Sequence, residues 1–378
     1  MTAIISKPDT QQKLEILSAD AQYDLACACG TNEDGHRRRG ERDKWIYPVT
    51  LPSGGTSLLF KTLISNVCSS DCKYCPLRAN QDVRRCTLSD EETVRTFLDY
   101  FNRREVFGLF LTSGVLGTPD ATMERLNRIA RILRYKRGFR GYIHLKIIPG
   151  ASAAAIEEAV SLSTAVSLNI ETPGADHLAK LSSSKRFVED IVEPIKLISR
   201  LTGRGNKYER VKQTTQFVVG AAGERDSEIV RYMWGLYDRL HLKRIYFSAY
   251  QKGLGHNSVD GPEELNPGDV FMREHRLYQV DFLMRKYGFT ESDICFDERG
   301  NLTLDIDPKE YWATLHPEYF PLDVNKASKY QLIRVPGLGE VTVNRILEHR
   351  KTAGIRSIDA LGKPSRRLEK ARSYIRFS

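Results

Sequence analysis

The sequence has no long hydrophobic run, although 41% of its 378 residues are hydrophobic. No apolar stretch reaches the length of a signal peptide or of a membrane-spanning helix, which needs about 20 residues. The opening segment is interrupted by Lys7, Asp9 and Lys13. These absences exclude a membrane protein and favour a cytoplasmic location without a membrane partner.

Cysteine is also scarce. The seven cysteines are odd in number and clustered, which excludes a disulfide framework and fits metal ligation in a reducing compartment. They are Cys27, Cys29, Cys68, Cys72, Cys75, Cys86 and Cys295.

Acidic residues are few in the last sixth of the chain. The formal charge is +9, and residues 322–378 hold thirteen Lys and Arg against five Asp and Glu, an excess of eight positive charges. This balance predicts a polyanionic partner. A second basic segment, 36–44, is polar and contains glycine, so it predicts a loop that is either solvated or in contact with a polyanion.

Internal repeats are absent, apart from an alternation of short apolar runs with stretches of helical period between residues 58 and 249. This alternation predicts parallel strands joined by helical crossovers. Ser89 and Glu92 have the spacing of a capping box, and Pro194 predicts a kink or a late start in its helix. The predicted strands are 58–64, 108–112, 142–147, 165–170, 213–219 and 244–249, and the predicted helices are 90–103, 121–135, 153–161, 187–201, 226–240 and 271–287.

The predicted fold class is α/β. Six β/α units indicate a partial (β/α)6 barrel of the TIM type, with its ligands at the carboxyl ends of the strands. A loop rich in Gly, Asn, Asp and Pro is predicted at 253–269. The predicted divisions are an N-terminal extension packed on the barrel (1–52), the barrel domain (53–290), a linker (291–321) and a small all-α domain (322–378).

Residues 68–75 hold three thiols and no nearby fourth. A structural zinc site needs four ligands, usually in two pairs, and Cys27 and Cys29 are too closely spaced to form the second pair. An iron-sulfur cubane held by three thiolates leaves one of its four irons open to a substrate or cofactor. The missing fourth cysteine therefore favours chemistry at a cluster, with incidental or structural cysteines as the alternative.

The pattern Cys68-x3-Cys72-x2-Cys75, with Tyr74 before the last cysteine and a strand before the loop, resembles the radical S-adenosylmethionine superfamily. The resemblance implies that the three cysteines hold a [4Fe–4S] cluster and that S-adenosylmethionine binds its open iron. It further implies reductive cleavage of S-adenosylmethionine to a 5′-deoxyadenosyl radical, which abstracts a hydrogen atom from the substrate. Tyr74 would pack near the adenine, and an electron donor such as flavodoxin or ferredoxin would be a partner.

The resemblance assigns further residues at the barrel edge. Ser113 and Gly114 match part of a Gly-Gly-Glu stretch that receives the methionine amino group in the family, but the acidic residue is absent, so a carbonyl or hydroxyl would have to serve. Other polar side chains alternate along their strands and so share one face. These side chains either bind the cofactor or pair with one another inside the barrel. The predicted cofactor-binding residues are Tyr74, Ser113, Gly114, His144, Lys146, Ser167, Asn169, Glu171, Gly220 and Ser248.

Two residues are candidates for catalysis. Cys86 follows the cluster loop and would quench a substrate radical by giving up hydrogen, with plain packing as the alternative. Tyr246 alternates with Ser248 on the sixth predicted strand. Gly220 either brings backbone close to the adenine or makes a turn.

The segment 323–350 predicts two helices that meet at a Pro-Gly-x-Gly turn, the second spanning 341–351. The two glycines permit positive φ and expose backbone amides to an anion. This segment resembles a helix-hairpin-helix motif, which contacts DNA phosphates without reading bases; docking on the barrel is the alternative use. A degenerate second copy follows at 358–367. The predicted DNA-binding residues are Lys326, Pro336, Gly337, Leu338, Gly339, Arg345, Arg350, Lys351, Arg366 and Arg367.

Nearly the whole chain resembles a subgroup of bacterial radical S-adenosylmethionine proteins predicted to modify or repair DNA. The stretches that carry this likeness are 109–116, 141–146, 273–279 and the hairpin. The expected function is radical modification or repair of DNA, with a target nucleotide extruded into the barrel. Two alternatives stay open: a radical enzyme acting on RNA or a small molecule, and a non-enzymatic iron-sulfur DNA-binding sensor.

Overall fold

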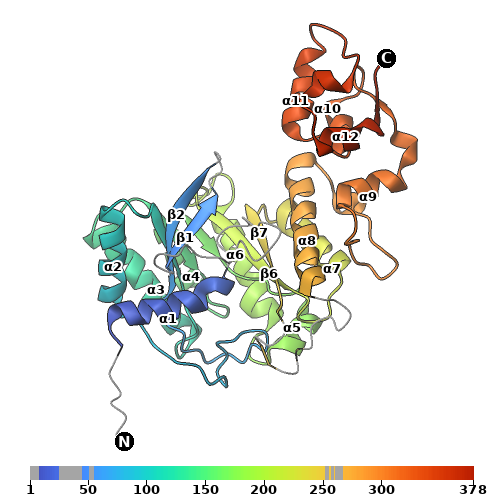
Figure 1. Cartoon of the computed structure of the whole chain (residues 1–378). Helices are drawn as coiled ribbons and strands as arrows, with labels where there is room; N and C mark the ends of the chain where they lie inside the picture. The colour runs from blue at the N-terminus through green and yellow to red at the C-terminus, as the bar shows by residue number, and fades with distance from the viewer. Residues whose placement is uncertain (1–7, 25–44, 51–54, 252–254, 257–258, 260–266) are drawn as a thin grey trace, which may run out of the picture. The chain divides into compact units, whose positions relative to one another are not determined.

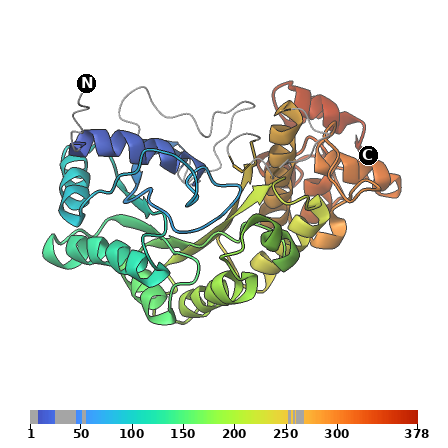
Figure 2. The same cartoon turned by 90° about the horizontal axis from the view of Figure 1, so that it is seen from below.

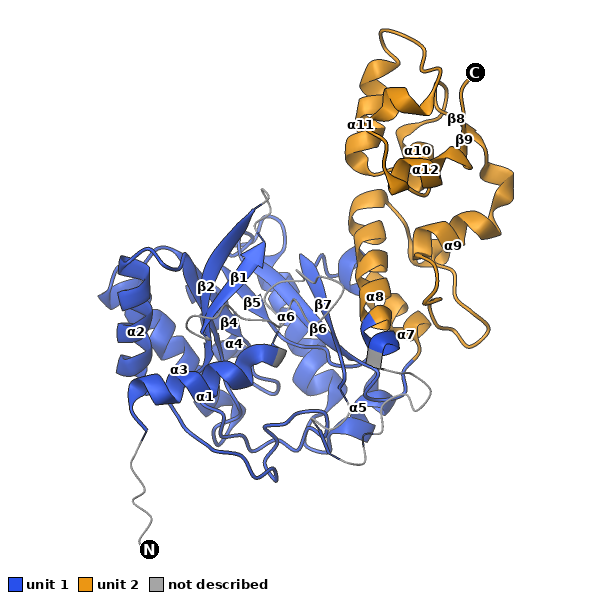
Figure 3. Cartoon of the chain, viewed as in Figure 1, with its two compact units in different colours: residues 1–224, 235–271 blue, residues 225–234, 272–378 orange. Residues whose placement is uncertain are grey.

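The computed structural model describes residues 8–24, 45–50, 55–251, 255–256, 259 and 267–378 (Figure 1). Cys27, Cys29, the basic segment 36–44 and most of the predicted loop 253–269 lie outside these residues. The chain divides into two compact units, Met1–Glu224 with Gly235–Phe271 and Arg225–Trp234 with Met272–Ser378 (Figure 3). None of the described helices is long and apolar enough to cross a membrane.

The first unit is built on a seven-stranded sheet with the strands in chain order. The first strand is antiparallel to the second, and the other neighbours are parallel. The sheet curls, with helices along its outer side (Figure 2), so the predicted partial (β/α)6 barrel is confirmed. The strands are β1 (Ile46–Thr50), β2 (Thr56–Leu63), β3 (Gly108–Thr112), β4 (Tyr142–Lys146), β5 (Ala165–Ser167), β6 (Lys212–Val219) and β7 (Arg244–Ala249).

The crossover helices begin where local sequence signals predict. The Ser89 side chain accepts from the Glu92 amide, and the Glu92 side chain accepts from the Ser89 amide, as a capping box requires. A π-helical stretch, Phe187–Val192, delays the helix that contains Pro194 until Glu193. The helices are α1 (Thr10–Asp20), α2 (Asp90–Asn102), α3 (Pro119–Arg131), α4 (Ala153–Leu162), α5 (Ala175–Leu181), α6 (Glu193–Thr202), α7 (Asp226–Asp238) and α8 (Pro267–Tyr287).

Two features of the sheet differ from the predictions. Strand β1 was not predicted. It lies in the segment expected to be an N-terminal extension, 1–52, and pairs with β2 of the predicted barrel domain. Strand β5 ends at Ser167 rather than at residue 170, because the Thr215 hydroxyl takes the place of a backbone partner. It accepts from the Ile170 amide and donates to the Leu168 carbonyl. Glu171 then turns the chain with a φ of 65°.

The second unit ends in a helical domain with its own hydrophobic core, formed by side chains such as Leu332, Val343 and Leu368. The predicted all-α domain has one addition: strands β8 (Leu322–Asp323) and β9 (Ile375–Arg376) pair and join its two ends. The helices after α8 are α9 (Pro308–Leu315), α10 (Lys329–Arg334), α11 (Glu340–His349) and α12 (Arg366–Arg372), and a short 3-10 helix spans Ile358–Leu361.

Candidate functional site

A cavity opens at the carboxyl ends of the parallel strands in the first unit, where the fold places ligand sites. It encloses about 190 Å³, and the loop after β2 and the ends of β3 to β7 line it. Ten of the predicted cluster and cofactor residues meet there, although they come from five separate segments of the chain. They are Cys68, Cys72, Tyr74, Cys75, Ser113, Gly114, Lys146, Asn169, Glu171 and Ser248.

Backbone amides surround the sulfur atoms of the cysteine loop. The amides of Ser70 and Val115 each donate to Cys68 Sγ at 3.4 Å, and that of Leu77 donates to Cys75 Sγ at 3.4 Å. Burial and, after it, the neighbouring Cys72 raise the pKa of the Cys75 thiol to about 12. Ionising these thiols together therefore requires a nearby positive charge, and metal binding would release their protons.

The donor set fits an iron-sulfur cluster better than a single ion. Among the residues that the structure describes, no three His, Cys, Asp or Glu side chains converge closely enough to hold one metal ion. A zinc ion needs ligands that meet at one point, whereas a four-iron cluster takes thiolates spread around its corners. Three thiols on one cavity wall, with amide donors to sulfur, match the second arrangement.

The turn after β3 lies directly against the cysteine loop. A Cβ atom at Gly114 would lie 2.4 Å from the Val67 carbonyl oxygen and 3.1 Å from Cys68 Cβ, so only glycine fits this approach. The Gly114 amide also donates to the Ser65 carbonyl at 2.8 Å. Gly114 therefore holds the first cysteine against the barrel edge.

Lys185 brings a positive charge to the thiols, and the sequence reasoning did not find it. Its Nζ lies 3.3 Å from the Tyr74 hydroxyl and 3.8 Å from the Glu171 carboxylate, and its side chain is largely buried. Burial alone would lower the pKa of Lys185, but Cys72 and Glu171 outweigh burial and raise it. The ammonium therefore stays charged beside the cysteine loop and balances thiolate charge.

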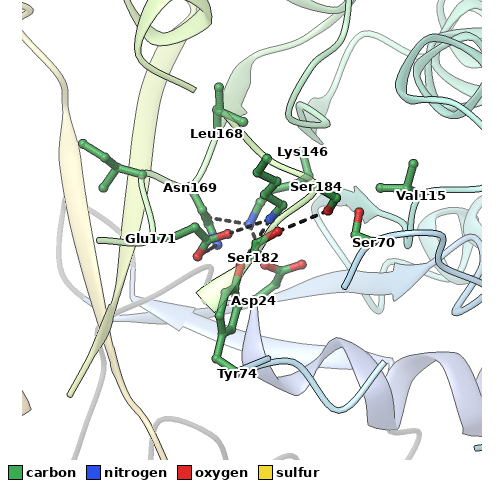
Figure 4. A network of polar contacts seen from close by, with 12 residues as sticks. Asp24, Ser70, Tyr74, Val115, Lys146, Leu168, Asn169, Glu171, Ser182 and Ser184 are labelled. Carbon is green, nitrogen blue, oxygen red and sulfur yellow. Dashed lines mark hydrogen bonds and ion pairs between the residues drawn. The ribbon is translucent and has the colours of Figure 1, made fainter. Parts of the chain in front are cut away.

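A polar network of side chains from other segments lines the same cavity. The Lys146 ammonium pairs with the Asp24 carboxylate and donates to Asn169 Oδ1 at 2.6 Å, and the Asn169 amide lies 3.4 Å from Glu171. Figure 4 shows these four side chains pointing toward one another. Burial would raise the pKa of Asp24, but Lys146 and other donors lower it, so the carboxylate stays ionised. Asp24 was missed because it lies far from the barrel strands in sequence.

Asp71 ties the cysteine loop to the serine segment 182–184. Its carboxylate accepts from the hydroxyls of Ser182 at 2.6 Å and Ser184 at 2.7 Å, and from the Ser183 amide at 2.8 Å. The next residue, Lys185, reaches Tyr74. This anchor therefore positions the cysteines and the buried cation together.

We expect Asp71→Asn to loosen the cysteine loop, because an amide nitrogen would face donors that now point at a carboxylate oxygen. The iron retained after reconstitution should fall about tenfold when a chelator competes for it. Asp82→Asn is the matched control, since Asp82 is exposed in the same loop. Equal iron retention in both variants would contradict the anchoring role.

Four predicted residues lie outside the cavity lining. His144 Nε2 lies 2.9 Å from the Ser167 hydroxyl, and burial together with Lys146 lowers the pKa of His144 to about 3. The imidazole is therefore neutral and paired within the barrel. Tyr246 lies near Tyr142, whose pKa is raised mainly by burial. The Gly220 amide donates to the Glu224 carboxylate in a turn with a φ of 88°. Cofactor and catalytic roles for these residues stay predictions.

Cys86 also lies away from the cavity lining. Its thiol faces the Lys13 carbonyl of α1 at 3.9 Å, and its amide donates to Asn66 Oδ1 at 2.7 Å. Burial raises the pKa of this thiol, as expected for a packed cysteine. The structure does not bring Cys86 to the other candidate residues.

The hairpin turn depends on one of its two glycines. Gly337 has a φ of 85°, and a Cβ there would lie 2.0 Å from the Arg367 carbonyl oxygen. Gly339, by contrast, does not use the positive φ that glycine permits: its φ is −109°, and it begins α11 in an extended conformation. The buried Lys309 donates to the Leu338 carbonyl at 2.6 Å and so fastens the turn to α9.

The predicted DNA-binding cations differ in availability. Arg350 donates to the Ala327 carbonyl at 2.6 Å, and Arg345 to the Leu361 carbonyl at 2.8 Å, so both brace the domain. Lys326 and Lys351 pair with neighbouring acids at 3.3 and 2.7 Å. The Arg366 and Arg367 side chains are exposed, and neither forms an ion pair among the described contacts. These two arginines are therefore the predicted cations most available to a phosphate.

Comparisons with known proteins agree with both sites. The chain matches the family model of the radical SAM superfamily over residues 62–233 and that of the helix-hairpin-helix motif over residues 320–376. No curated protein matches the sequence.

Several solved structures are similar to the chain at low identity. Methylornithine synthase is 14% identical with a TM-score of 0.47 and covers 60% of this chain, which spans 63% of that enzyme. The [FeFe]-hydrogenase maturase HydG is 12% identical with a TM-score of 0.46, over 83% of this chain and 80% of its own. SuiB of Streptococcus suis, solved with S-adenosylmethionine, is 13% identical with a TM-score of 0.45, over 61% of this chain and 49% of its own.

The family matches fall on the two features that the residues themselves single out. The first match covers the three thiols, their amide donors and most of the cavity lining, and the second covers the glycine turn and its basic surroundings. The chain therefore carries a radical SAM domain over residues 62–233, of the family that uses a [4Fe–4S] cluster and S-adenosylmethionine, and a helix-hairpin-helix motif over residues 320–376.

Proposed function

We propose that this protein is a radical SAM enzyme that modifies or repairs DNA. The observation that carries the proposal is the presence, on one chain, of a three-thiol radical SAM site and a helix-hairpin-helix domain with an excess of eight positive charges. Hairpins of this kind bind phosphates through backbone amides and cations, which suits a polymer of any sequence.

In the barrel, Cys68, Cys72 and Cys75 would hold the cluster, and Lys185 would balance their charge. A bound cluster with S-adenosylmethionine supplies a 5′-deoxyadenosyl radical, which can abstract hydrogen from an unactivated carbon of a base or sugar. The remaining lining residues would bind and orient the cofactor from the strand ends. They are Tyr74, Ser113, Gly114, Lys146, Asn169, Glu171 and Ser248.

The hairpin domain would hold the nucleic acid by its phosphates, with Arg366 and Arg367 as cations beside the Gly337 turn. The five cysteines among the described residues are unbridged, which supports a reducing, cytoplasmic setting, where an electron donor such as flavodoxin or ferredoxin would reduce the cluster. Extrusion of a target nucleotide would deliver the reacting carbon to the barrel.

Binding at several salt concentrations tests the nucleic-acid partner. We expect duplex DNA to bind with an affinity that falls steeply with salt, and Arg366→Gln and Arg367→Gln each to reduce the slope of log affinity against log salt by about one. Arg137→Gln, an exposed arginine of the barrel unit, is the control. Tighter binding to structured RNA than to DNA would contradict the DNA assignment, and a slope near zero would remove the nucleic-acid partner altogether.

A further inference from the structure

A groove in the second unit lies between the hairpin turn and the turn after the 3-10 helix. It holds about 430 Å³, and its walls are the turn 337–339, the start of α11, the segment 361–368 and the last part of α8. All of these elements belong to the same compact unit. The groove shares no residue with the thiol cavity of the barrel.

Two apolar side chains of this groove are exposed. Phe282 of α8 is 45% exposed, and Val341 of α11 is 74% exposed. The Phe282 ring meets the Tyr287 ring edge to face, with centroids 5.1 Å apart, so Tyr287 fixes its orientation. Tyr287 is held in turn, because the Lys309 ammonium lies over its ring, 4.8 Å from the centroid. The groove therefore presents a positioned aromatic ring to solvent.

The polar part of the groove is basic. Lys363 and Arg367 line it, and no ion pair or hydrogen bond of either side chain is found among the described contacts. Arg345 adds a third cation, although its guanidinium also donates to the Leu361 carbonyl. The one acidic side chain in the lining, Glu340, has Lys329 at 3.9 Å. The charge of the groove thus favours an anionic occupant.

We propose that this groove binds an unpaired nucleotide of a nucleic-acid strand. The base stacks on Phe282 beside Val341, and the flanking phosphates lie on Lys363 and Arg367. A hairpin that contacts only the backbone of a paired duplex has no use for an exposed aromatic ring, since the bases of a duplex already stack on one another. A base with a free face can stack on any positioned aromatic side chain, whatever its sequence.

This inference rests on the proposed nucleic-acid function and makes it narrower. The protein would bind single strands, or duplexes with an unpaired nucleotide, more tightly than fully paired DNA. An unpaired nucleotide also costs less to extrude than a paired one, which suits an enzyme that acts on a base or sugar inside a barrel.

The test compares full-length protein on three labelled DNAs: a single strand, a paired duplex, and the same duplex with one bulged 2-aminopurine nucleotide. We expect the bulged duplex and the single strand to bind more tightly than the paired duplex, and the 2-aminopurine fluorescence to be quenched on binding. Phe282→Ala should weaken binding of these two about tenfold, remove the quenching and leave the paired duplex unchanged.

Leu315→Ala is the matched control, because Leu315 is an exposed apolar residue of the same unit outside the groove lining. Lys363→Gln provides a second variant, and it should reduce the salt slope by about one. If the wild type binds the three DNAs equally and Phe282→Ala changes none of them, the groove is not a nucleotide site, whereas the proposed function survives. If no nucleic acid binds at all, both the nucleotide site and the proposed function are contradicted, and the groove is left as a docking face for a protein.

Discussion

Replacing Cys72 by alanine is expected to abolish both the iron-sulfur cluster and the cleavage of S-adenosylmethionine. Cys72 is buried in the cavity wall beside Lys185, so its loss removes a third of the donor set and one of the two anionic partners of that cation, leaving it Glu171 alone. After anaerobic reconstitution, the variant should lack the broad visible absorbance of a cluster. Formation of 5′-deoxyadenosine under strong reduction should fall at least about a hundredfold.

Cys295→Ala is the matched control for this result. Cys295 is a free, half-buried thiol of the second unit, near the Asp293 carbonyl at 3.8 Å, and it has no place in the cavity. Its variant should keep full iron content and activity. A cluster that survives Cys72→Ala, or one that is lost equally in Cys295→Ala, would contradict the assignment of the three ligands.

Replacing Gly337 by alanine is expected to disrupt the hairpin domain and its nucleic-acid binding while sparing the cluster. The new methyl group would lie 2.0 Å from the Arg367 carbonyl oxygen in a left-handed conformation, so the turn and α12 must move apart. We expect a destabilisation of about 3 kcal/mol or more in the free energy of unfolding of this domain. Hydrogen exchange of the domain amides and salt-dependent DNA binding would measure the two effects.

Gly354→Ala controls for the loss of a glycine in the same domain, since a Cβ there meets no atom within 4 Å. It should leave exchange and binding close to the wild type. Iron content should be unchanged in both variants, because the thiols lie in the other unit. A Gly337→Ala protein that binds DNA with wild-type affinity would show that the hairpin turn is not the binding element.

The fold was predictable to the extent that its signals are local. The Ser89 capping box, the effect of Pro194 and the six parallel strands depend on residues close together in sequence, and the structure confirms them. Strand β1 was missed because an antiparallel edge strand breaks the β/α alternation that identified the others. The early end of β5 depends on the Thr215 side chain of the neighbouring strand, which no local pattern reveals.

The residues of the candidate site were likewise predictable only where their signal is local in the sequence. The three cysteines form one continuous motif, so their spacing identified them, and the resemblance to the radical S-adenosylmethionine superfamily added Tyr74. Lys185 follows three serines that show no chemistry until Asp71 brings them to the cysteine loop. His144 and Lys146 alternate identically on β4, yet His144 pairs with Ser167 inside the barrel while only Lys146 lines the cavity. Alternation predicts a shared face, and packing across strands decides which residue reaches the opening.

The transfer of deuterium from DNA to the cofactor tests the central claim most directly. Reconstituted, reduced protein would be incubated with S-adenosylmethionine and with DNA deuterated in its bases and sugars, and the 5′-deoxyadenosine would be analysed by mass spectrometry. A radical enzyme acting on DNA predicts deuterium in the 5′-deoxyadenosine, absent in Cys72→Ala and with unlabelled DNA. 5′-Deoxyadenosine that forms without deuterium would contradict DNA as the substrate, and its complete absence would contradict the enzyme itself.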